Sequence, residues 1–129
     1  MKEIIKKWIL YANADLDVAQ RLFQSPKPNQ WTYLLVLWHC HQAIEKMLKM
    51  LIVKQGKELL KIHDLLRLTK VSNISLSAEQ KEFLEDLNEF YLRSRYPDIL
   101  YKPLSHPNKN FTKIYLEKTK KLFLWLKKQ

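Results

Sequence analysis

Apolar residues recur at alternating steps of four and three along most of the chain, which is the spacing of one face of an α-helix. This pattern predicts a first helix over residues 2–24 and a longer second helix that opens at Asn29 and stops at Gly56. Two prolines lie between these helices. The apolar positions are Ile5, Ile9, Ala12, Leu16, Ala19 and Phe23, then Tyr33, Leu37, Cys40, Ile44, Met47 and Leu51.

The second half of the chain predicts three more helices. Asp64 is placed to cap a short helix, and Ser77 opens a further helix that runs up to Pro97. The last helix begins near Asn108 and reaches the end of the sequence. We therefore expect an all-α fold over residues 1–129: an up-and-down antiparallel four-helix bundle with one additional short helix, in a single domain.

Composition supports this fold and excludes several others. Apolar residues make up 47% of the 129 residues, which is typical of a globular chain. Gly56 is the only glycine, which argues against an all-β fold, a Rossmann fold and a phosphate-binding loop. Cys40 is the only cysteine, so an internal disulfide is excluded and a reducing cytoplasm is expected. No signal-peptide core and no membrane-spanning apolar run is evident.

The chain carries 23 basic and 13 acidic residues, a net charge of +10. This charge suits an acidic partner such as a nucleic acid, a nucleotide or an acidic protein, or it marks a well-solvated surface. The lysine-rich last helix shows no base-reading side chains, so sequence-specific DNA binding is not expected. Trp125 and Leu126 belong to its inward face, so no membrane partner is expected either.

The first candidate for a functional site is the polar segment RSRYPD, residues 93–98. Arg93 and Arg95 are two residues apart, so on a helix they flank opposite sides and reach one ligand only if the proline unwinds the helix. Asp98 can hold an arginine by paired hydrogen bonds, and Tyr96 can stack on a guanidinium or a base. The alternative is an ordinary helix end, where the arginines meet the negative end of the helix dipole.

A second candidate is the polar edge of the long helix, which includes Gln42, Glu45, Lys46 and Lys49. It is either a solvated face with local ion pairs, or a dimer seam or wall of a nucleotide groove. In the second case Glu45 pairs with one of the arginines and positions it.

Histidines give the remaining candidates. His39 and His41 flank the cysteine, but neighbours on a helix point in different directions, so we expect no metal site and no cofactor. His63 and Asp64 form either a catalytic pair or a histidine followed by a helix cap.

Four segments of the chain, read in order, resemble the HEPN domain family (higher eukaryotes and prokaryotes nucleotide-binding). They are ANADLDVAQRLF on the first helix, CHQAIEKMLKMLIVKQG on the second, then IHDLLRL and RSRYPD. The family is a bundle of four or five helices and usually a homodimer. Many small prokaryotic members are encoded beside a minimal nucleotidyltransferase, in pairs that look like toxin–antitoxin modules. The resemblance thus implies a nucleotide- or RNA-binding module that acts with such a partner.

Other family members are metal-independent ribonucleases that use an arginine and a histidine a turn or two apart on one helix. This sequence departs from that pattern, because the first histidine after Arg95 is His106, which is 106 − 95 = 11 residues away. A ribonuclease would therefore use Arg95 with His106 or with His63. A third alternative is a purely structural dimeric partner that binds no ligand.

Overall fold

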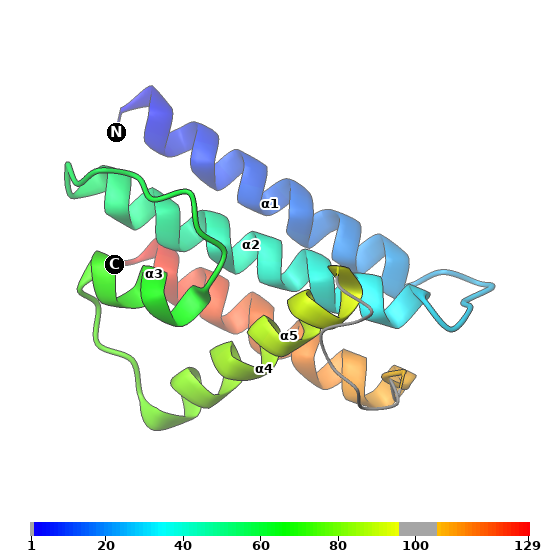
Figure 1. Cartoon of the computed structure of the whole chain (residues 1–129). Coiled ribbons are helices and arrows are strands. Elements are labelled where there is room, and N and C mark those ends of the chain that lie inside the picture. The colour runs from blue at the N-terminus through cyan, green and yellow to red at the C-terminus, as the bar shows by residue number, and fades with distance from the viewer. Residues whose placement is uncertain (1, 96–105) are drawn as a thin grey trace.

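The computed structural model describes residues 2–95 and 106–129, and within these ranges the chain is helical without strands (Figure 1). The helices are α1 (Glu3–Phe23), α2 (Thr32–Lys54), α3 (Leu65–Ser72), α4 (Ala78–Arg95) and α5 (Lys109–Lys127). The predicted all-α fold is confirmed, with four long helices and one short helix.

The central element is α2, which contacts α1, α3, α4 and α5. Helix α1 lies antiparallel along it (Figure 1). Leu37, Ile44 and Met47 on α2 are fully buried, as the four-three spacing of the sequence predicts. Since α2 is surrounded by other helices, polar side chains on its flanks are also buried, and these form the site described below.

Side-chain caps set several helix ends where the sequence places them. The Asp64 carboxylate accepts a hydrogen bond from the backbone N–H of Leu66 at 3.0 Å, which starts α3. Ser77 and Gln80 form the predicted reciprocal capping box before α4, with bonds of 2.9 and 3.0 Å. The Asn108 side chain caps α5. These contacts show that the local sequence, and not only packing, determines where the helices begin.

The ends of α2 show one difference from the sequence prediction. Asn29 does not cap α2 directly, because its side chain accepts from the backbone N–H of Trp31 at 2.8 Å and forms a turn before the helix begins at Thr32. At the other end Gly56 follows α2 with a φ of +72°, a conformation that favours glycine. The predicted stop at Gly56 is therefore confirmed.

Candidate functional site

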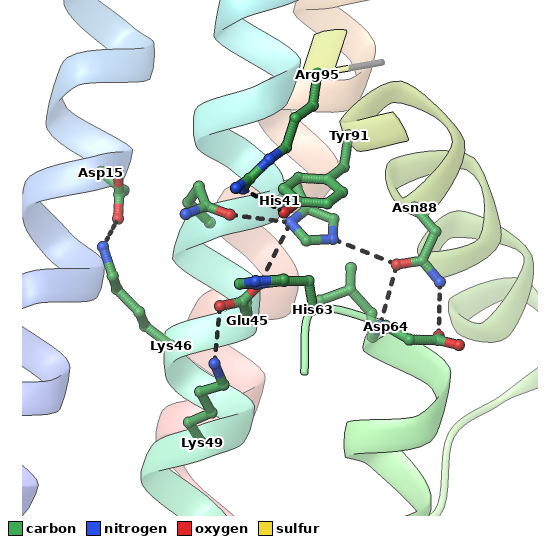
Figure 2. Close-up of polar contacts among 12 residues, drawn as sticks. Asp15, His41, Glu45, Lys46, Lys49, His63, Asp64, Asn88, Tyr91 and Arg95 are labelled. Atoms are coloured by element: carbon green, nitrogen blue, oxygen red, sulfur yellow. Dashed lines mark hydrogen bonds and ion pairs between the residues drawn. The ribbon is translucent and has the colours of Figure 1, made fainter. Parts of the chain in front are cut away.

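Glu45 on α2 lies at the centre of a buried polar cluster that faces α3 and α4 (Figure 2). Lys49 Nζ donates to one carboxylate oxygen at 3.0 Å, and His63 Nδ1 lies 2.9 Å from the other. A buried carboxylate needs such partners, because they replace the hydration that it loses. Lys49 and His63 are thus partners of Glu45 that the sequence did not predict.

The Glu45 contact also orients His63. A carboxylate oxygen only accepts hydrogen bonds, so His63 carries a proton on Nδ1 and donates it to Glu45. In the neutral ring Nε2 is then an acceptor. The His63 side chain is 49% exposed, so this histidine is held from inside the protein while solvent reaches it from outside.

Asn88 on α4 ties the cluster to α3. Its Oδ1 accepts from the backbone N–H of Leu65 at 3.0 Å and lies 3.3 Å from His41 Nε2, while its Nδ2 donates to Asp64 at 2.9 Å. Because Oδ1 is fixed as an acceptor, His41 donates from Nε2. Burial lowers the pKa of His41 below its usual value, although nearby Glu45 opposes this effect. Asp64 therefore has the structural role of a helix cap, and His41 is an internal residue whose burial disfavours the protonated ring.

Tyr91 covers His41 and holds Arg95 at the edge of the cluster. The Tyr91 ring stacks on the His41 ring with centroids 4.3 Å apart, and its centroid lies 5.4 Å from that of His63. Arg95 Nη1 donates to the Tyr91 hydroxyl at 2.7 Å. Tyr91 is buried, whereas Arg95 is exposed at the end of α4. A positioned cation thus lies where the buried cluster meets solvent (Figure 2).

Arg93 belongs to a different side of α4. Its Nη2 donates to Glu89 at 2.6 Å, and it lines a cavity of about 480 Å³ with Phe90 and His106. Helix α4 continues through both arginines, so they remain on opposite flanks and the expected convergence on one ligand is not seen.

The other predicted site residues also lie in different parts of the structure. The His106 ring lies 5.1 Å from that of Trp31, and His106 lines the cavity that Arg93 lines. His63 and Arg95 both contact the Tyr91 ring, with the His63 centroid at 5.4 Å and the Arg95 guanidinium carbon at 5.8 Å from its centroid. Tyr96 and Asp98 lie outside the described residues.

A second histidine–carboxylate pair lies on the opposite side of α2, and it was not predicted from the sequence. His39 Nδ1 lies 3.0 Å from Asp15 Oδ1 on α1, and Lys46 donates to the other oxygen of Asp15. His39 and Arg95 line one cavity of about 290 Å³. Its other lining residues are Leu35, Trp38 and Ser94.

The two histidines beside Cys40 point toward different helices. His39 points to α1 and His41 to α4, as expected for residues on different faces of a helix. Burial raises the pKa of Cys40 to about 12, so it stays a thiol. In residues 2–95 and 106–129, no group of three or more histidine, cysteine or acidic side chains could hold a metal ion. None of the helices described is long and apolar enough to span a membrane.

Comparison with known proteins identifies the family of this chain. The HEPN domain matches residues 5–129. The crystal structure of TT1696 from Thermus thermophilus superposes with a TM-score of 0.80 at 19% identity, covering 98% of each chain. That of ST0689, an archaeal HEPN homologue, gives a TM-score of 0.74 at 24% identity, covering 100% of this chain and 98% of the other. No curated protein matches the sequence. Because the family match spans nearly the whole sequence and both structures share the fold, this chain belongs to the HEPN domain family.

Proposed function

We propose that this HEPN domain protein binds single-stranded RNA through Arg95, as a module that works with a separately encoded minimal nucleotidyltransferase. One observation carries the proposal: Arg95 is exposed, is bonded to Tyr91 at the edge of the buried cluster, and lines a cavity with Trp38. A guanidinium fixed in this way loses little freedom when it binds a phosphate.

The cavity beside Arg95 offers what a nucleotide of single-stranded RNA requires. The planar guanidinium can donate two parallel hydrogen bonds to a phosphodiester. Trp38 is half-buried and supplies an aromatic surface on which a base can stack. The net charge of +10 favours the approach of a polyanion.

Glu45 and Lys49 take a different part in this proposal from the one that the sequence predicted. They were expected to contact the ligand, but each neutralises the other inside the protein at 3.0 Å. We assign them to positioning: Glu45 fixes His63, whose ring packs against Tyr91, and Tyr91 in turn holds Arg95.

The test compares two arginines on one helix. Binding of a fluorescent single-stranded RNA oligonucleotide in EDTA is measured for the wild type, Arg95→Ala and Arg93→Ala. The two variants lose the same charge, but Arg93 pairs with Glu89 in the other cavity. We expect Arg95→Ala to weaken binding by roughly tenfold or more, as for a lost charged hydrogen-bond pair, and Arg93→Ala to have a much smaller effect. Equal loss of RNA affinity in the two variants would mean that binding depends only on the overall positive charge of the protein, and this would contradict the proposal.

Metal-independent RNA cleavage is the second candidate function. Proton transfer requires a histidine with a defined tautomer near the phosphate-binding arginine. Two histidines here are oriented through Nδ1 by carboxylates: His63 by Glu45 and His39 by Asp15. The expected result is cleavage of RNA in EDTA that is lost in Arg95→Ala. Binding without cleavage would support the binding module alone.

The proposal includes two protein partners that family membership implies: a second copy of this chain and a minimal nucleotidyltransferase. Ile4, Tyr11 and Val18 are exposed at intervals of seven residues along α1, which supports a helix-to-helix contact between copies. Light scattering after size exclusion should give the mass of a dimer. Co-purification with the product of a neighbouring nucleotidyltransferase gene would support the second partner, and a free monomer with no such neighbour would contradict both.

A further inference from the structure

We propose that His39 on α2, oriented by Asp15 on α1, is the general base that works with Arg95 of α4 on an RNA phosphodiester. The arginine–histidine pair is then built from two helices that are far apart in sequence. This inference rests on the proposed binding of RNA at Arg95, and it assigns the reacting residue within that site.

The Asp15 carboxylate fixes the tautomer of His39. Burial alone would raise the pKa of Asp15, but hydrogen bonds from His39 and Lys46 outweigh this effect and lower it. Asp15 is therefore ionised at neutral pH and can only accept. Since His39 Nδ1 lies 3.0 Å from it, this nitrogen carries the proton, and the neutral ring presents an unprotonated Nε2.

Packing holds His39 in this orientation. Its side chain is 21% exposed, and the Trp38 ring contacts it edge-on with centroids 4.8 Å apart. Lys46 neutralises the Asp15 carboxylate from the next turns of α2 (Figure 2). A histidine whose tautomer and ring plane are both fixed is suited to proton transfer, because no reorganisation is required during the reaction.

Position relative to Arg95 distinguishes His39 from His63. His39 and Arg95 line the same cavity of about 290 Å³, into which a phosphodiester can enter. His63 and Arg95, by contrast, each contact the buried Tyr91 ring. Figure 2 shows Arg95 extending from the end of α4 toward α2, the helix that carries His39. A phosphate that Arg95 binds in this cavity therefore lies beside His39, which lines the same cavity.

The reaction that this geometry supports is transesterification at the ribose. His39 Nε2 takes the proton of the 2′-hydroxyl, O2′ bonds to phosphorus, and the bond from phosphorus to O5′ breaks. The leaving O5′ takes a proton from water, and His39 later returns its proton to solvent. Arg95 donates to the non-bridging oxygens, where negative charge grows in the transition state. The products are a 2′,3′-cyclic phosphate and a 5′-hydroxyl.

The experiment measures cleavage and binding of one fluorescent single-stranded RNA, in EDTA, for the wild type, His39→Gln and His106→Gln. His106 serves as the matched control because it lines the other cavity. We expect His39→Gln to lose about 100-fold or more in cleavage rate with RNA binding retained, and His106→Gln to cleave like the wild type. The same oligonucleotide with 2′-deoxyribose throughout should bind but remain intact.

A second variant separates chemistry from folding. His39→Ala leaves a space beside the cavity, so added imidazole should restore part of the lost cleavage, which it cannot do for a misfolded protein. Wild-type binding without cleavage, or full cleavage by His39→Gln, would overturn the assignment of His39 while RNA binding at Arg95 stands. Loss of cleavage in His63→Gln but not in His39→Gln would overturn it in favour of His63. Absence of RNA binding would overturn the proposed function as well.

Discussion

The side chain of Asn88 in α4 accepts a hydrogen bond from the backbone N–H of Leu65, the first residue of α3, at 3.0 Å. The first amides of a helix have no partner within the helix, so a residue from another helix here completes the end of α3. The same Asn88 side chain contacts His41 on α2 and Asp64. Three parts of the bundle are thus joined through one amide group.

Replacing Asn88 by alanine should destabilise the fold by about 2 to 3 kcal/mol, because the buried His41 ring and the Leu65 amide both lose a partner. Urea unfolding followed by circular dichroism measures this change. Asn13→Ala is the matched control, since Asn13 is exposed on α1, and it should have little effect. Equal stabilities for the two variants would show that the Asn88 contacts are not formed in solution.

The buried pair of Glu45 and Lys49 should be strongly coupled. Glu45→Gln leaves the Lys49 ammonium, which is 10% exposed, without a counter-charge, and should cost about 3 kcal/mol of unfolding free energy. Combining Glu45→Gln with Lys49→Met removes both charges and should recover part of this loss. The exposed pair of Asp17 and Arg21 is the control, and Asp17→Asn should leave stability nearly unchanged. Additive effects of the two buried substitutions would argue against the ion pair.

His41 should make the protein less stable as the pH falls below about 6.5. The folded pKa of His41 is lowered by burial, so between its folded and unfolded values only the unfolded chain binds the proton. Protonation in this window therefore favours unfolding. Comparison of the wild type with His41→Leu at about pH 7.5 and about pH 5.5 isolates this contribution, because the other titrating groups are common to both proteins.

The wild type should lose more unfolding free energy between these two pH values than His41→Leu does. Asp15 also has a lowered pKa, but its contribution is lost only as the pH falls below its usual 3.8, so the two effects occur in separate windows. If the wild type instead became relatively more stable in acid, His41 would hold a proton in the folded protein, contrary to its burial.

The sequence predicts the helices and their caps because these depend on residues close together in the chain. The four-three apolar spacing identifies the buried face of α2, and Asp64 and Ser77 act on amides two or three residues away. The resemblance to the HEPN family predicts the overall fold. The helix boundaries and caps could be predicted without knowing how the helices pack.

The candidate site was harder to predict, because its contacts join residues that are distant in sequence. His63 and Glu45 are 18 residues apart, and His39 and Asp15 are 24 apart. Both pairings therefore depend on how α1, and the segment that precedes α3, pack against α2. Convergence of Arg93 and Arg95 was expected from the proline at position 97. A proline restricts the residue directly before it, however, and α4 stays helical up to Arg95.

Cys40 provides a direct probe of how often the bundle opens. It is fully buried on α2, and burial raises its pKa to about 12, although a hydrogen bond to Thr119 and the charge of Lys120 act in the opposite direction. Both the low thiolate population and the lack of access should slow the reaction with a disulfide reagent at about pH 8. We expect the folded protein to react only slowly, whereas the urea-unfolded chain reacts rapidly and fully.

The control is a single cysteine placed in the exposed loop between α1 and α2, Lys27→Cys in a Cys40→Ala background. This protein should react rapidly without urea, which shows that the reagent is active under folding conditions. Because Cys40 is the only cysteine, the slow labelling rate of the wild type reports the opening of the core around α2. Rapid labelling of Cys40 in the folded protein would mean that α1 and α5 separate from α2 far more readily than their packing indicates.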